Sequence, residues 1–421
     1  MQPKASTESP AASTSARRKG FLLGVVSVLG FALLVSCLRE TPRDVVGTET
    51  HDVRLTLAGF GDLPGWSEGD MRAALSAFRG SCASFEAMDP DALLGGENYS
   101  GKVREWLPVC QTARRAGATK TAARIFFEEN FRPFAISDAE GREGLFTGYY
   151  EPVLRGSRTR SAEFPTPLYG RPGDLVIVDL GRFRPGLAGD RLAGRVEDGQ
   201  LLPYPSRGDI VRGVLEGRAT PLLYVDSGID AFFLHIQGSG RVELAEGGTV
   251  RVGYEAQNGH PYVAIGRVLI DAGEITKDGV SMQSIRTWLE DHPDRAEEVM
   301  DTNPSYVFFR EMELGDPALG PVGAQGVGLT DEASLAVDRR FHAFGMPMWL
   351  DGFAPQAGEG DRKFQRLLIA QDTGGAIRGV VRGDVFWGHG PGPADIAGRM
   401  QHRGELYVLL PKAVAARQAR R

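Results

Sequence analysis

The 55 glycines and 25 prolines of this 421-residue chain restrict its fold more than any other feature. From Gly148 to Gly279, short apolar alternations are separated by clusters of Gly, Pro and Asp. This pattern is typical of short strands joined by tight turns, and it favours a barrel-like β protein over a helical bundle. The expected strands include Val53–Leu57, Leu175–Val178, Leu222–Val225 and Val250–Tyr254, and a further β-rich stretch follows Pro304 as far as Lys412.

A smaller set of segments has the apolar spacing of a helix. After Ser67, a suitable N-cap, the residues Met71, Leu75, Phe78 and Cys82 fall on one helical face. The other expected helices are Trp106–Arg115, Thr121–Asn130 and Ser281–Asp291, together with a frayed helix in the basic tail 413–421.

The length of the chain predicts two domains, because a single core rarely grows this large. We expect an N-terminal helical part and a C-terminal β part to form one domain, with the middle β region inserted between them. The predicted boundaries are 61–160 for the first part, 161–315 for the insertion and 316–412 for the second part. The net charge of −6 argues against nucleic-acid binding.

Residues 1–37 have the order of an export signal. Arg17, Arg18 and Lys19 precede an uncharged apolar run from Phe21 to Leu38. The run contains Leu34-Val35-Ser36-Cys37, which looks like a bacterial lipobox with Cys37 as the lipidated residue. The alternative is an uncleaved transmembrane anchor, since eighteen residues approach the lower limit for a span. Both alternatives place the rest of the chain outside the cytoplasm, after a linker over 38–60.

Two cysteines remain besides Cys37. In an oxidising compartment, Cys82 and Cys110 are an even pair that can form a disulfide. Closing a loop of about 29 residues would contribute on the order of 3–4 kcal/mol to stability. Two buried free thiols are the alternative.

Three aspartates mark the C-terminal β region as the place for acid–base chemistry. Asp338 follows an apolar run, Asp372 precedes Thr373-Gly374-Gly375, and Asp384 precedes Val385-Phe386-Trp387. Apolar surroundings raise the pKa of a carboxyl, which is what a general acid requires, so Asp384 is the expected acid. Asp372 is expected to accept backbone N–H bonds, to stay ionised and to tune the site. A Gly-rich turn region whose Asp side chains only cap turns is the alternative.

The order of the three aspartates and the residues around them resemble the 3D domain, which is named for three aspartates. The segments Phe146–Pro152 and His235–Gly240 are similar to the other signature motifs of the membrane-bound lytic murein transglycosylase A family. The resemblance covers roughly residues 60–412. It implies a mainly β fold with some helices: a double-psi β-barrel domain interrupted by a second small β-barrel domain, with a groove between them.

The resemblance also implies a reaction and a substrate. The family cleaves the β-1,4 bond between N-acetylmuramic acid and N-acetylglucosamine in peptidoglycan and forms 1,6-anhydromuramoyl ends. The aspartate at the position of Asp384 acts as acid and then as base, so one aspartate suffices. The expected partners are glycan strands and peptidoglycan synthases. A lipid anchor is expected to hold the protein on the periplasmic side of the outer membrane, and an inner-membrane anchor is the alternative. The residues expected to bind substrate are Tyr149, Tyr150, Gln237, Ser239, Gly240 and Asp338.

The sequence alone leaves alternatives to this function. Asp372 and Asp384 would also suit a hydrolytic endoglycosidase with two carboxylates, and the chain could be a non-catalytic wall-binding module. Tyr149 and Tyr150 would either stack on sugar rings or fill a core. We expect no metal or cofactor, because the seven histidines are scattered and His235 lies in an apolar run that we interpret as a strand.

Overall fold

The computed structural model describes residues 53–418 except 188–189, 315–318, 357 and 359. The predicted signal segment, Cys37 and most of the linker lie outside the described residues. These described residues form one compact unit. Within the part that the structure describes, no helix combines the length and apolar character needed to cross a membrane.

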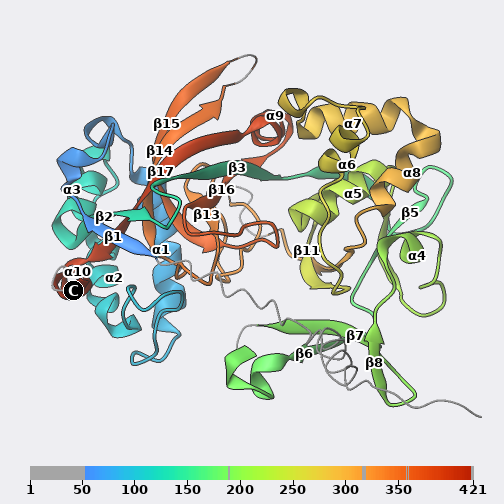
Figure 1. The fold of residues 1–421 in the computed structure, drawn as a ribbon, viewed down its shortest axis with the longest axis horizontal. Coiled ribbons are helices and arrows are strands. Elements are labelled where there is room, and N and C mark those ends of the chain that lie inside the picture. The colour runs from blue at the N-terminus through green and yellow to red at the C-terminus, as the bar shows by residue number, and fades with distance from the viewer. Residues whose placement is uncertain (1–52, 188–189, 315–318, 357, 359, 419–421) are drawn as a thin grey trace, which may run out of the picture. The chain divides into compact units, whose positions relative to one another are not determined.

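The larger sheet of the described chain, whose strands are labelled in Figure 1, closes on itself because β17 pairs with both β14 and β3. Its eight strands follow the order β1-β2-β17-β14-β15-β13-β16-β3, and an additional β17–β3 pairing joins six of them into a ring. The pairs β3–β16 and β13–β15 are parallel, whereas the others are antiparallel. The strands are Arg54–Leu57 (β1), Phe131–Ser137 (β2), Glu143–Glu151 (β3), Ser334–Val337 (β13), Pro347–Pro355 (β14), Asp361–Asp372 (β15), Arg382–His389 (β16) and Gln401–Pro411 (β17).

A second sheet is inserted between β3 and β13. Among the described residues it contains six strands in the order β12-β11-β10-β4-β9-β5, and a bridge between Gly170 and Phe309 links its two ends. A small sheet of β6, β7 and β8 accompanies it. The strands are Val153–Ser157 (β4), Thr166–Tyr169 (β5), Val176–Asp179 (β6), Arg191–Glu197 (β7), Gln200–Pro203 (β8), Pro221–Val225 (β9), Ser239–Leu244 (β10), Thr249–Gln257 (β11) and Val307–Met312 (β12).

The expected fold class, mainly β with some helices, is therefore confirmed. The two sheets have separate apolar cores, so the ring and the insertion are distinct packing units. The chain changes sheets at Pro152, because β4 already pairs with β9 and β10. The predicted boundary between residues 160 and 161 would place β4 with the ring.

The helices that the spacing predicted are present, and the first of them begins later than expected. The first helix begins at Arg72, where Asp70 Oδ1 accepts the backbone N–H of Arg72 at 3.1 Å. Ser67 is therefore not its N-cap; it lies in a 3-10 turn, and its hydroxyl donates to Glu68. These helices are Arg72–Glu86 (α1), Leu107–Arg115 (α2), Lys120–Asn130 (α3) and Met282–Asp291 (α7).

Other helices interrupt regions that we expected to be β-rich or left unassigned. His235, placed in a strand by the sequence, lies in a helix that Ser227 caps and that ends before Gly238 in the left-handed conformation. The reason for the error is that a continuous short apolar run does not distinguish a buried strand from a buried helix. These helices are Arg207–Val211 (α4), Gly228–Gln237 (α5), Ile265–Asp271 (α6), Pro293–Asp301 (α8) and Pro391–Arg399 (α9).

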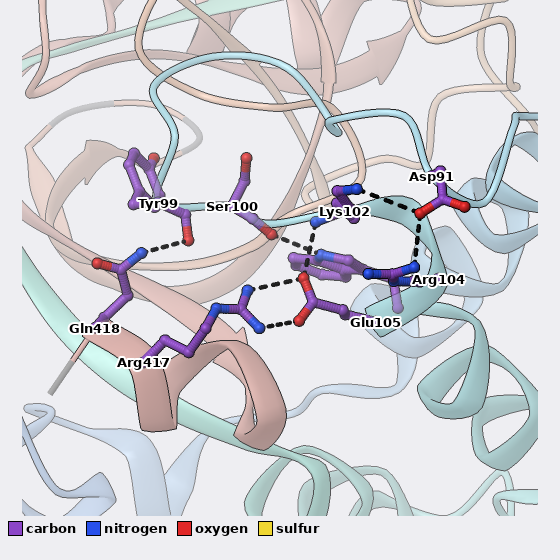
Figure 2. A network of polar contacts seen from close by, with 9 residues as sticks. Asp91, Tyr99, Ser100, Lys102, Arg104, Glu105, Arg417 and Gln418 are labelled. Carbon is purple, nitrogen blue, oxygen red and sulfur yellow. Dashed lines mark hydrogen bonds and ion pairs between the residues drawn. The ribbon is translucent and has the colours of Figure 1, made fainter. Parts of the chain in front are cut away.

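The C-terminal helix Lys412–Gln418 (α10) is fastened to the N-terminal helical part (Figure 2). Both Nη atoms of Arg417 donate to the carboxylate of Glu105, and Gln418 Nε2 donates to Tyr99 O at 3.1 Å. Glu105 also accepts the backbone N–H of Lys102 at 2.9 Å. The expected helix in the tail is thus present over Lys412–Gln418 and is tied to residues 99–105, while residues 419–421 lie outside the described part of the chain.

Cys82 on α1 and Cys110 on α2 form a disulfide. We expect the double variant Cys82→Ala/Cys110→Ala to lose about 3–4 kcal/mol of unfolding free energy, because the unfolded chain regains the freedom of the open loop. Urea denaturation followed by circular dichroism measures this loss. The reduced wild-type protein is the control, since it lacks the bond but keeps both sulfur atoms. A midpoint unchanged by both treatments would contradict the prediction.

Candidate active site

Asp384 lies within β16, between two other strands of the ring. It is opposite Thr147 on β3 and opposite Ala336 on β13. Thr147 Oγ1 donates a hydrogen bond of 2.6 Å to Asp384 Oδ1. The Asp384 residue is half-buried. The strand register therefore fixes this carboxyl while leaving part of it accessible.

Asp372 is the last residue of β15, on the other side of β13. Ala336 is paired with Asp372 in one direction and with Asp384 in the other. Adjacent strands are about 4.8 Å apart, so the Cα atoms of the two aspartates are about 10 Å apart. Residues directly opposite one another share a face of the sheet. The ring therefore brings both predicted catalytic aspartates to one face.

Both carboxylate oxygens of Asp372 accept hydrogen bonds from the protein. The Tyr149 hydroxyl donates to Oδ2 at 2.9 Å. The backbone N–H groups of Ala324 and Thr373 donate to Oδ1, each also at 2.9 Å. The Tyr149 ring lies against Phe386 of β16, with 5.2 Å between the ring centroids. Tyr149 thus connects Asp372 to the strand that carries Asp384.

The end of β15 is held by the buried side chain of Gln371. Its Nε2 donates to Ser81 Oγ on α1 at 2.9 Å, and its Oε1 accepts from Ser334 Oγ on β13 at 2.6 Å. The backbone N–H of Gln325 donates to Gln371 O at 3.0 Å. The loop that supplies the N–H of Ala324 is therefore attached to the strand that ends in Asp372.

Burial raises the pKa of Asp384, as the apolar residues that follow it predicted. The Arg382 guanidinium and the Thr147 hydroxyl act in the opposite direction and lower this pKa. The charge on Asp372 adds to the increase, because two nearby negative charges disfavour each other. Asp384 consequently holds its proton at higher pH than an exposed aspartate.

The pKa of Asp372 is also raised, which corrects the expectation of a readily ionised carboxylate. Burial is the main cause, and it outweighs the bonds from Ala324, Thr373 and Tyr149 that stabilise the charge. The same carboxylate and burial raise the pKa of Tyr149 well above its usual value. Tyr149 is therefore a hydrogen-bond donor at neutral pH.

The residues expected to bind sugar occupy different environments. Tyr150 is 6% exposed and belongs to the core of the ring, so its ring offers no face for stacking. Gln237, the last residue of α5, accepts the backbone N–H of Tyr150 at 3.2 Å. Ser239 begins β10 and is half-buried. Gly240 is buried, and a side chain there would meet Leu234 and Pro152.

Asp338 is separate from this arrangement. Its side chain is fully buried, and Arg340 forms an ion pair with it at 2.7 Å. It also accepts the backbone N–H of Gly379 at 3.0 Å. Burial works to raise the pKa of Asp338, but these bonds outweigh it and the pKa is lowered. Asp338 therefore stabilises a turn, as in the alternative in which Asp side chains only cap turns.

Comparisons with known proteins match this chain to one family. Residues 145–310 match the MltA specific insert domain, and residues 333–410 match the 3D domain. Membrane-bound lytic murein transglycosylase A of Escherichia coli is 34% identical over 324 residues, which cover 74% of this chain and 75% of that protein. This chain belongs to the membrane-bound lytic murein transglycosylase A family.

Solved structures of the same family have the same fold. A membrane-bound lytic murein transglycosylase from Agrobacterium tumefaciens is 35% identical, with a TM-score of 0.76 over 86% of this chain and 99% of that chain. Escherichia coli MltA with bound chitohexaose is 27% identical, with a TM-score of 0.62 over 85% and 94% of the two chains. The insertion and the ring therefore correspond to the family's own architecture.

Sequence reasoning missed two residues beside Asp384. Thr147 lies in the family motif that includes Tyr149, and residues two apart on a strand share a face. Period-two spacing could therefore have placed Thr147 with Tyr149. Arg382 Nη2 donates to Thr147 Oγ1 at 2.8 Å. No local pattern pointed to Arg382, because its contact depends on the β3–β16 pairing.

Proposed function

We propose that Asp384 is the acid and then the base of this peptidoglycan lytic transglycosylase. The enzyme cleaves the β-1,4 bond between N-acetylmuramic acid and N-acetylglucosamine in glycan strands. The observation that carries the assignment is a half-buried carboxyl with a raised pKa, fixed through Oδ1 only. Its Oδ2 has no hydrogen-bond partner among the described residues, so it is available to a substrate.

The reaction needs one proton carrier. Protonated Asp384 gives its proton to the glycosidic oxygen as the bond from muramoyl C1 to that oxygen breaks. The resulting carboxylate then takes the proton of the muramoyl C6 hydroxyl, whose oxygen bonds to C1. The product is a 1,6-anhydro ring, no water is consumed, and Asp384 is protonated again. The intramolecular nucleophile has a high effective concentration, which lowers the entropic barrier.

The contacts of Asp372 favour this mechanism over hydrolysis with two carboxylates. A water-activating base needs an oxygen free to accept a proton from water. Oδ1 of Asp372 already accepts the N–H groups of Ala324 and Thr373, and Oδ2 accepts the Tyr149 hydroxyl, so at most one lone pair remains for a water molecule. We assign Asp372 to the positioning of Tyr149 beside β16 and to the electrostatics of Asp384.

We place glycan strands along the face that carries the two aspartates. The Escherichia coli relative contains bound chitohexaose, which supports a sugar polymer as ligand here. Tyr149, Gln237 and Ser239 are half-buried and remain candidates for sugar contacts. Tyr150, Gly240 and Asp338 would instead support the backbone. The cavity of about 510 Å³ among Arg171, Arg218 and Arg310 in the insertion includes none of these residues.

Mass spectrometry of muropeptides released from purified sacculi tests the function. The proposal expects 1,6-anhydromuramoyl ends. Reducing ends would identify a hydrolase, and no release would identify a wall-binding module.

We also propose that Cys37 is lipidated and anchors the enzyme to the periplasmic side of the outer membrane. The membrane-bound relatives support an attachment to membrane, and the Leu34–Cys37 segment supports a lipid. Cys37→Ala should abolish incorporation of labelled palmitate and precursor processing, because the acylated thiol is gone. Cys82→Ala is the matched control and should be labelled normally. Labelling of Cys37→Ala at the wild-type rate would exclude the lipoprotein. Peptidoglycan synthases remain proposed partners.

A further inference from the structure

Arg382, Thr147 and Asp384 form a continuous chain of hydrogen bonds. Arg382 Nη2 donates to Thr147 Oγ1 at 2.8 Å, and Thr147 Oγ1 donates to Asp384 Oδ1 at 2.6 Å. Arg382 is itself oriented by Leu145 O, which accepts from its Nη1 at 3.4 Å. All three residues of the chain are half-buried, so they are partly shielded from competing water.

The donor and acceptor roles in this chain follow from chemistry. A guanidinium only donates, so Thr147 Oγ1 accepts from Arg382. The hydroxyl has a single proton, and a separation of 2.6 Å is typical of O–H donation to a carboxylate. Oδ1 of Asp384 therefore receives that proton. The transferable proton of the acid is left to Oδ2, the oxygen without a described protein partner.

We propose that Thr147 and Arg382 are positioning residues that fix the transferable proton of Asp384 on Oδ2, facing the glycosidic oxygen. This inference rests on the proposed role of Asp384. Without the chain, the carboxyl would rotate about its χ2 angle, and protonation on Oδ1 would compete. A smaller fraction of enzyme molecules would then hold the proton toward the substrate, so turnover would fall while binding would remain.

Other charged or titratable groups also act on Asp384. The charge on Asp372 of β15 raises the pKa of Asp384. Tyr149 of β3 interacts electrostatically with both Asp372 and Asp384. β13 places uncharged Ala336 opposite Asp384. Asp395 and Arg399 of α9, which packs on β16, form an ion pair with each other at 2.5 Å. Arg382 is thus the cation that lowers the pKa of Asp384.

The first test replaces Thr147 in two ways. Thr147→Val keeps the shape and removes the hydroxyl, so kcat should fall about 10-fold with KM unchanged. Thr147→Ser keeps the hydroxyl and should restore kcat to within about twofold of the wild type. Because the bond from Thr147 lowers the pKa of Asp384, its loss should move the alkaline limb of the pH–rate profile to higher pH. Thr56→Val, an exposed change on β1, is the matched control.

The second test asks whether Arg382 acts through Thr147. Arg382→Met should lower kcat by a similar factor, and Arg382→Lys, which keeps charge and donor, should recover part of the loss. The double variant Thr147→Val/Arg382→Met should have no lower kcat than the worse single variant, because both changes break one chain. Independent roles would instead multiply the two losses.

These outcomes separate the positioning proposal from the proposed function. If folded Thr147→Val had the wild-type kcat and pH profile while Asp384→Asn was inactive, the positioning role of Thr147 and Arg382 would be overturned. The assignment of Asp384 as the acid would stand. Full activity of Asp384→Asn would overturn the acid itself. If kcat fell in Thr147→Val and Thr147→Ser did not restore it, Thr147 would have a packing role. That result would also overturn the positioning proposal.

Discussion

Replacing Asp384 with Asn should lower the turnover of glycan strands by at least about 100-fold, the lower range of general acid–base catalysis. The amide keeps the shape of the side chain and still accepts from Thr147, but it has no transferable proton. Affinity for a chito-oligosaccharide should survive, because the lost interaction belongs to the transition state. Anhydro-muropeptide formation by mass spectrometry measures the rate, and isothermal calorimetry measures the affinity.

The companion variant Asp372→Asn distinguishes the mechanisms. Its loss of turnover should be smaller than that of Asp384→Asn if one carboxylate does the chemistry, and similar if Asp372 activates water.

The wild-type enzyme should lose activity as the pH rises through the pKa of Asp384, because cleavage begins from the protonated acid. That pKa is raised, so the loss should occur above the usual range of an exposed aspartate. Near-wild-type rates in Asp384→Asn would reject the assignment.

Replacing Glu151 with Ala should lower the free energy of unfolding by about 3–5 kcal/mol. Glu151 ends β3 and is fully buried, and its carboxylate accepts from Arg241 at 2.8 Å and from Arg251 at 2.6 Å. These arginines belong to β10 and β11 of the insertion. Removing the carboxylate leaves two buried guanidinium groups without their anionic partner, and the carbonyl contacts of Arg251 do not replace the lost charge.

Urea denaturation measures this loss, and Glu163→Ala is the matched control. Glu163 pairs with Arg155 at 2.5 Å, but both side chains are more than half exposed, so the change should cost about 0–1 kcal/mol. Equal losses of unfolding free energy in the two variants would contradict the prediction, because burial of the Glu151 ion pairs would then add nothing to stability. A large effect of Glu151→Ala would identify this cluster as a main connection between ring and insertion.

The sequence predicted those elements whose signal is local. The spacing of Met71, Leu75 and Phe78 predicted α1 because one face of that helix is buried in the core. It failed for α5, although Ser227, Asp230 and Gly238 mark both helix ends. It also failed for α9, where Pro391-Gly392-Pro393 resembles a loop but proline suits the first turn of a helix.

The site was predictable to the extent that each residue carries its own chemistry. The apolar neighbours of Asp384 indicated a raised pKa, and the motif indicated Tyr149. The meeting of Asp384 with Thr147 depends on a parallel pairing between strands far apart in sequence. Asp338 differs, because Arg340 pairs with it only two residues later, in a local turn that the sequence allowed as an alternative. Long-range register therefore accounts for the part of the site around Asp384 that the sequence could not predict.

The position of β17 has a consequence for biosynthesis. This strand pairs with β14, β2 and β3, and its contact with β3 joins residues roughly 250 positions apart. The ring thus stays open until residues 401–411 have left the ribosome and reached the folding compartment. A nascent chain without them exposes the edges of β3 and β14, which invite aggregation and proteolysis. A chain that ends at a premature stop before Gln401 would therefore be degraded as an incompletely folded protein. This would happen even though such a chain contains both aspartates of the site.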